Sequence, residues 1–125
     1  IMNIIYEQES YKIIGLCMEI HRELRHGFSE IVYKDAMEYE FRKNHILYER
    51  EKEFIIYYKD YELPHRFYAD LVVFEDIILE IKAKKDGIDN TSISQTLNYM
   101  KAADSPLGLI INFGEESLKH KRLVF

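Results

Sequence analysis

The segment ADLVVFEDIILEIKA, residues 69–83, restricts the fold of this chain more than any other part of the sequence. Two apolar runs rich in valine and isoleucine are separated by an acidic pair, a pattern typical of two β-strands joined by a turn. Charged groups are rare in buried strands, because an ionised group removed from water needs a partner. Asp70, Glu80 and Lys82 nevertheless lie within the two arms, so their partners are the first question that the sequence raises.

The length of the turn decides where Asp70 points. Side chains alternate along a strand, so Glu80 and Lys82 project from one face, about 7 Å apart. A two-residue turn would place Asp70 opposite Ile81. A three-residue turn, Phe74 to Asp76, would place it opposite Glu80, on the same face. The sequence leaves both registers open. The apolar residues of the second arm divide in the same way, with Ile78 on the face of Glu80 and with Ile77, Leu79 and Ile81 on the opposite face.

The three-residue turn would bring two carboxylates together, which destabilises a sheet unless a positive group lies between them. A divalent cation can do this, because Mg²⁺ binds hard oxygen ligands and leaves other positions for water and a substrate phosphate. Lys82 beside it could orient or deprotonate a water for attack on phosphorus. The spacing therefore fits metal-assisted hydrolysis of a phosphodiester. The alternative is a salt bridge between Lys82 and Glu80 or Asp70 on the solvent face of the hairpin.

Two helices are expected before this segment. Ser10 is a candidate N-cap of the first helix, which should end near Gly27. Ser29 is a candidate N-cap of the second helix, which should end at Asn44 and His45. The remaining elements, in order, are a β-rich block over 46–83 with a turn at Lys59 and Asp60, a helix capped by Thr91 or Ser92 that runs to about Ala103, a central strand over 107–113 and a last strand over 121–125.

The expected order α-α-β-β-β-β-α-β-β implies a mixed sheet covered by helices, an α/β fold of the mixed α+β kind. At 125 residues, the chain can bury one core, so we expect residues 1–125 to form a single domain. The longest apolar run is too short to span a bilayer. The chain opens without a positively charged, apolar leader. We therefore expect a cytoplasmic protein with no membrane partner.

The formal charge of −5 argues against a protein that coats nucleic acid by electrostatic attraction. It does not argue against an enzyme that acts on nucleic acid, since clustered carboxylates can hold divalent metals. The single cysteine, Cys17, excludes an internal disulfide, and we expect it in the core. No Cys/His spacing is typical of a zinc site.

Asp70 followed by Glu80, Ile81 and Lys82 resembles the D…(D/E)xK signature of the PD-(D/E)XK nuclease superfamily, although Ala69 stands where the superfamily name has proline. Two further motifs strengthen the resemblance. The stretch QTLNYMKA, with Gln95 and Tyr99, resembles the Q-x-x-x-Y element of RecB-like and phage-exonuclease-like branches. The stretch GFSEIVY, with Gly27, Glu30 and Tyr33, resembles the motif that names the GxxExxY protein family.

The resemblance implies a restriction-endonuclease-like core and a set of roles. Lys82 would assist the attacking water, and Gln95 and Tyr99, on one helical face, would line the site. Mg²⁺ or Mn²⁺ would be held by Glu30, Asp70, Glu80 and the backbone carbonyl of Ile81.

Some of these residues have a simpler explanation. A carboxylate at the position of Glu30 favours the helix dipole regardless of catalysis. Tyr33, one turn later, is expected to pack rather than to act in chemistry. Gln95 and Tyr99 would otherwise be a polar stripe on a helix.

The function implied by the resemblance is a metal-dependent nuclease. Superfamily analogy selects DNA over RNA, and fold alone does not fix function. A domain of this size would recognise ends, single strands or branched shapes, or it would act in a homodimer or beside a protein partner that positions it. The alternative is a catalytically weak or inactive nuclease-fold module that binds nucleic acid or protein. Hydrolysis of a smaller phosphodiester also stays open.

Overall fold

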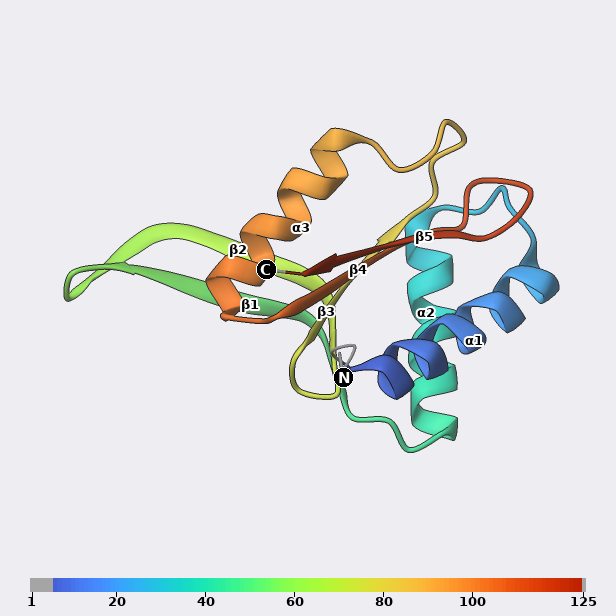
Figure 1. Cartoon of the computed structure of the whole chain (residues 1–125), viewed down its shortest axis with the longest axis horizontal. Helices are drawn as coiled ribbons and strands as arrows, with labels where there is room; N and C mark the ends of the chain where they lie inside the picture. Colours follow the sequence, from blue (N-terminus) through green and yellow to red (C-terminus); the bar gives the residue numbers. More distant parts are fainter. Residues whose placement is uncertain (1–5, 125) are drawn as a thin grey trace, which may run out of the picture.

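The computed structural model describes residues 6–124, which form three helices and five strands around one sheet (Figure 1). The predictions about the start of the chain and about Phe125 lie outside these described residues. The elements are α1 (Glu7–Leu24), α2 (Glu30–Lys43), β1 (Tyr48–Tyr58), β2 (Tyr61–Val73), β3 (Ile77–Lys82), α3 (Asn90–Ala103), β4 (Leu107–Asn112) and β5 (Lys119–Val124).

The five strands form one mixed sheet in the order β1-β2-β3-β4-β5. All neighbours are antiparallel except β3 and β4, which are parallel and need the crossover that α3 provides. The predicted fold class is therefore confirmed. Three strands precede α3, however, where the sequence predicted four. The turn at Lys59 and Asp60 returns the chain at once, so that Tyr58 pairs with Tyr61 and the whole block becomes one long hairpin before β3.

The β1–β2 hairpin extends beyond the rest of the sheet (Figure 1). β2 starts at Tyr61, well before Ala69, where the first apolar arm described from the sequence begins. The proline in this added part is tolerated because the register of the two strands shifts between Ile55 and Tyr57. Pro64 lies opposite the shift, where a residue without an N–H costs the ladder no hydrogen bond.

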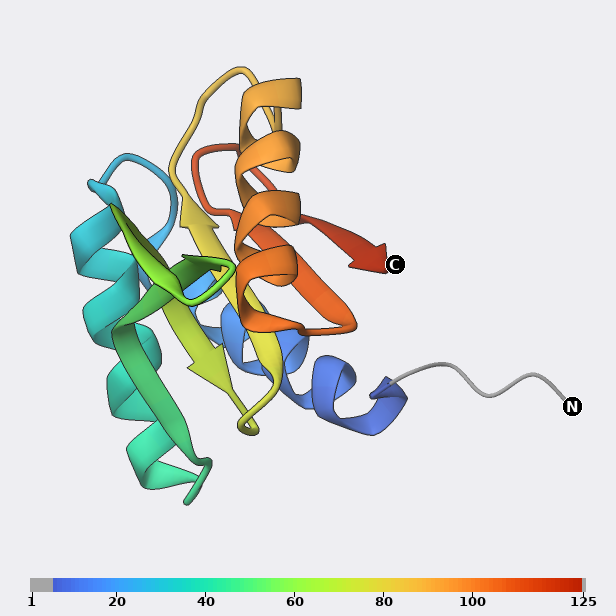
Figure 2. The same ribbon diagram turned by 90° about the vertical axis from the view of Figure 1, so that its left-hand side faces the viewer.

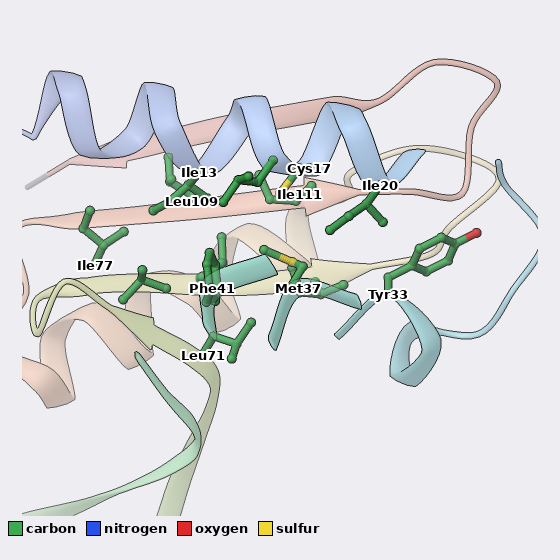
Figure 3. Close-up of a cluster of buried hydrophobic side chains, with 14 of the residues drawn as sticks. Ile13, Cys17, Ile20, Tyr33, Met37, Phe41, Leu71, Ile77, Leu109 and Ile111 are labelled. Atoms are coloured by element: carbon green, nitrogen blue, oxygen red, sulfur yellow. The ribbon is translucent and has the colours of Figure 1, made fainter. Parts of the chain in front are cut away.

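The sheet separates two hydrophobic clusters. Helices α1 and α2 cover one face, and α3 covers the other (Figures 1 and 2). Ile77, Leu79 and Ile81 of β3 belong to the larger cluster beneath α1 and α2 (Figure 3). Ile78 belongs to the smaller cluster, with Met100 of α3. The predicted alternation along β3 is confirmed, and the remaining even-numbered positions of this strand accordingly face α3.

Two residues that the sequence assigned to packing are fully buried. Cys17 lies in the larger cluster, and burial raises the pKa of its thiol. The ring of Tyr33 stacks on Phe113 with 4.5 Å between centroids, and its hydroxyl donates to the Arg25 carbonyl at 2.6 Å. Tyr33 therefore fixes α2 and the preceding loop against the sheet.

The helix starts differ from the prediction in two of three cases. α1 begins three residues before Ser10, whose buried hydroxyl donates to a backbone carbonyl of the first turn instead of capping the helix. α3 is capped by Asp89, upstream of Thr91 and Ser92, and the Asp89 carboxylate accepts from the Ser92 N–H at 2.8 Å. Ser29 is the N-cap residue of α2, as predicted. None of the helices within residues 6–124 is long and apolar enough to cross a membrane.

Candidate functional site

The turn between β2 and β3 has three residues, Phe74 to Asp76. Val73 pairs with Ile77 directly on either side of it. This is the longer of the two registers that the sequence left open. Continued along the strands, it brings Asp70 opposite Glu80.

Regular pairing between β2 and β3 ends at Leu71 and Leu79, and side chains replace the ladder beyond that point. The Ile81 N–H donates to Asp70 Oδ2 at 2.8 Å, and the Asp70 N–H donates to Glu80 Oε1 at 3.3 Å. Both carboxyl groups are thus held by backbone donors of the neighbouring strand. The two acidic side chains meet where the strands separate, so their position is set by the sheet itself.

Glu80 is an acid in an environment that disfavours its charge. Only 2% of the residue is exposed. Burial, followed by the negative charge of Asp70 and a hydrogen bond with it, raises the pKa of Glu80 to about 10. The raised pKa of Glu80 favours the protonated form of its carboxyl when no cation is bound.

This donor set fits a small divalent cation. Mg²⁺ is commonly bound by one or two carboxylates and keeps its remaining positions for water and phosphate oxygens. Asp70 and Glu80 supply two hard oxygen ligands side by side, and a cation between them would replace the proton on Glu80. No group of three His, Cys, Asp or Glu side chains within residues 6–124 is arranged to hold a metal. The fit therefore rests on the Asp70–Glu80 pair alone.

Lys82 lies beside this pair and is oriented by α3. Its Nζ donates to Gln95 Oε1 at 3.0 Å. Tyr99 is one helical turn further along α3, and burial and then the negative charges of Glu80 and Asp70 raise the pKa of its hydroxyl. The structure thus brings together five of the predicted residues: Asp70, Glu80, Lys82, Gln95 and Tyr99.

Glu30 does not join the carboxylate pair. It is the first residue of α2, and no hydrogen bond or ion pair within the described residues links it to Asp70 or Glu80. Together with Lys34 and Ala83 it lines a hollow of about 500 Å³. Lys34, one turn later on α2, contacts Asp70, so the hollow lies next to the carboxylate pair. Glu30 is one of the residues that line this hollow.

Lys34 is a site residue that the sequence reasoning missed. Its Nζ lies 3.1 Å from Asp70 Oδ1 and 2.6 Å from Glu51 Oε1. Burial acts to lower the pKa of Lys34, but the hydrogen bonds and charges of Glu51 and Asp70 outweigh it and raise that pKa. A signal was present, because Lys34 follows Glu30 by four residues and so shares its helical face.

Glu51 completes a row of acids across three strands. Its neighbours Arg50 and Lys52 pair with Leu71 and Ala69, so Glu51 lies opposite Asp70. Its backbone has a φ of 53°, a left-handed conformation that is uncommon for a residue with a side chain. The interruption of the β1–β2 ladder at Glu51 therefore coincides with the separation of β2 from β3.

A mixed sheet between helices, with a buried carboxylate pair where two strands separate and a lysine beside it, has the features of a nuclease-type domain. The sequence matches the model of the PD-(D/E)XK nuclease superfamily over residues 7–123, and the chain belongs to this superfamily. No curated protein matches the sequence. The crystal structure of SSO0001 is similar, with a TM-score of 0.58 and 16% identity. The match covers 95% of this chain and 59% of the SSO0001 chain, and at this identity it supports the fold alone.

Proposed function

We propose that this protein hydrolyses phosphodiester bonds in nucleic acid, DNA in the first instance, with the help of Mg²⁺ or Mn²⁺. The observation that carries the proposal is the meeting of Asp70 and Glu80 next to Lys82, in a chain of a nuclease superfamily. In the same proposal, the motif with Gly27, Glu30 and Tyr33 supports membership of the GxxExxY family. The motif with Gln95 and Tyr99 supports the RecB-like and phage-exonuclease-like branch.

Each residue of the site has a role in this proposal. The carboxylates of Asp70 and Glu80, with the carbonyl of Ile81, would hold the cation, and Glu30 would contribute from α2. A bound divalent cation would acidify a nearby water and neutralise charge on the phosphate. Lys82 would orient that water.

The residues of α3 support Lys82. Gln95 accepts a hydrogen bond from its ammonium group and limits the directions in which it can point. Tyr99, buried one helical turn further along α3, would line the site beside Lys82 and contact the substrate.

The second candidate is a binding module without catalysis. Lys34 favours it, because its ammonium group pairs with Asp70 and could neutralise the carboxylates in place of a metal. Such a module would bind nucleic acid or a protein, alone or as a homodimer. A protein partner that positions the domain is part of either proposal.

The test is a cleavage assay with end-labelled single-stranded, duplex and branched DNA, and with RNA, in Mn²⁺. We expect cleavage by the unaltered protein and at least a hundredfold loss in Glu80→Gln and in Lys82→Ala. Lys101→Ala, an exposed lysine on α3, is the matched control and should keep full activity. Binding of nucleic acid without cleavage, unchanged by the first two substitutions, would favour the binding module.

A further inference from the structure

A second hollow, of about 510 Å³, opens between β2 and α3. We call it the β2–α3 hollow. It is bounded by His65, Phe67 and Tyr68 from β2 and by Gln95, Asn98 and Tyr99 from α3. α3 runs beside the projecting hairpin at this place (Figure 1).

Gln95 connects this hollow to the candidate site. Its side chain lines the hollow and also accepts the hydrogen bond from Lys82 at 3.0 Å. Tyr99 lines it too, and the pKa of Tyr99 responds to the charges of Glu80 and Asp70. A group seated in the hollow would therefore lie next to a phosphate at Lys82.

The β2 side of the hollow is built from rings. His65 and Phe67 meet edge to face with 4.9 Å between centroids, and Phe67 and Tyr99 meet in the same way at 5.7 Å. His65 is exposed, whereas Tyr99 is buried. The rings thus form a row from the surface to the candidate site. Tyr68, 49% exposed, adds a further ring at the rim.

The α3 side of the hollow is polar but uncharged. Thr91, Ser94 and Asn98 are exposed there at helical spacing, and they offer hydroxyl and amide groups as donors and acceptors. No carboxylate lines the hollow among the described residues. The one guanidinium there, that of Arg66, pairs with Glu53 at 3.0 Å and with Glu62. The hollow therefore suits a flat, uncharged, polar group better than a phosphate.

We propose that the β2–α3 hollow binds an unpaired nucleobase next to the phosphate that is cleaved, so that the substrate is a single strand or a single-stranded end. The inference rests on the proposed function. Bases of a duplex are stacked on their neighbours and expose no face, whereas an unpaired base can stack on protein rings. Hydrogen bonds from Ser94 and Asn98 would meet the base edge.

The test uses the full chain in EDTA, so that binding is measured without cleavage. The probes are a single-stranded DNA that contains 2-aminopurine and the same strand in a duplex. We expect quenching of the 2-aminopurine fluorescence with the single strand only. His65→Ala should weaken binding roughly tenfold, because stacking of a base on a ring is lost, and Asn98→Ala should weaken it several-fold. Tyr11→Ala, which removes an 82% exposed ring on α1, is the control and should bind normally.

Equal affinity for duplex and single strand, or unchanged affinity in both hollow variants, would overturn the inference. The cleavage assay separates this failure from failure of the proposed function. If duplex DNA is cleaved and the cleavage depends on Lys82 but not on His65, the proposed nuclease activity is supported and the proposed base site is refuted. If the quenching depends on His65 but no substrate is cleaved in Mn²⁺, the base site is supported and the proposed nuclease activity is refuted.

Discussion

Lys34 of α2 forms an ion pair with Asp70, with 3.1 Å between Nζ and Oδ1, at the point where β2 and β3 separate. Only 13% of the Lys34 side chain and 16% of the Asp70 side chain are exposed, so solvent screens the pair incompletely. The lysine therefore provides positive charge where a metal ion would provide it, and the two cations should repel each other.

Lys34→Met tests this competition. We expect Mn²⁺ to bind roughly tenfold more tightly, because a positive charge near the ion is removed. Without metal, the variant should lose about 1–3 kcal/mol of unfolding free energy, because Asp70 loses a charged partner. Calorimetric titration with Mn²⁺ and denaturant unfolding in EDTA measure the two effects. Lys101→Met, at an exposed position, should change neither, and weaker Mn²⁺ binding by Lys34→Met would show that the lysine assists the metal.

The raised pKa of Glu80 predicts an unusual pH dependence of stability. Since the folded protein holds this proton up to about pH 10 and the unfolded chain releases it near 4.5, the folded state binds more protons between these values. The contribution of Glu80 to the free energy of unfolding in EDTA should therefore be greatest below pH 4.5. It should fall as the pH rises, by at most about 1.4 kcal/mol per pH unit.

Glu80→Gln should remove this slope, because the amide resembles the protonated acid and does not titrate. Urea unfolding of the two proteins at several pH values between 5 and 9 is the measurement. Glu116→Gln, at an exposed position, is the control and should keep the slope. An unaltered protein whose stability does not fall with pH would mean that Glu80 is ionised in the fold.

Lys82 and Gln95 should differ in their effects on cleavage and metal binding. Lys82→Ala should lower the cleavage rate about 10²–10⁴-fold, the range typical of a lost proton-transfer group. Gln95→Ala should lower it less, because the lysine remains but is no longer held by its 3.0 Å hydrogen bond. Neither variant should weaken Mn²⁺ binding by more than a few-fold. A large loss of Mn²⁺ affinity in either would assign that residue to the metal instead.

Two glycines provide a matched test of the fold around the site. A Cβ on Gly114 would lie 2.4 Å from the Lys84 backbone nitrogen, just beyond β3. Gly114→Ala should therefore destabilise the protein by about 1–3 kcal/mol or more. A Cβ on Gly15, inside α1, meets nothing within 4 Å, and Gly15→Ala should stabilise by about 0.5–1 kcal/mol. Thermal unfolding of both variants compares them, and an unharmed Gly114→Ala would contradict the close packing described here.

The parts of the site that the sequence could predict depend on regular periodicity. Alternation along β3 put Glu80 and Lys82 on one face. It narrowed the position of Asp70 to two registers, and the structure shows the one that sets Asp70 against Glu80. Gln95 and Tyr99 follow from helical spacing in the same way. These residues are close in sequence, or are separated by a single turn. Their relative positions therefore follow largely from the periodicity of the strand or helix that carries them.

The parts that the sequence could not predict depend on contacts between distant segments. Lys34 and Asp70 are 36 residues apart. The helical spacing of Lys34 relates it to Glu30 but not to Asp70, and only the packing of α2 brings it to the end of the β2–β3 ladder. Glu51 lies beside Lys34 and Asp70 with its backbone in a left-handed conformation. No local sequence motif predicts that conformation. The cap of α3 at Asp89 was missed for a smaller reason, since several adjacent residues are all suitable caps.

In the proposed function Asp70 and Glu80 form a divalent-metal site, and titration with Mn²⁺, followed by the electron paramagnetic resonance of the free ion, measures whether they do. We predict saturable binding by the unaltered protein, with affinity at least tenfold weaker in Asp70→Asn and in Glu80→Gln and unchanged in Glu116→Gln. Binding should also raise the melting temperature of the unaltered protein, because the ion favours the folded state. Absence of binding, or binding that survives both substitutions in the pair, would contradict the claim.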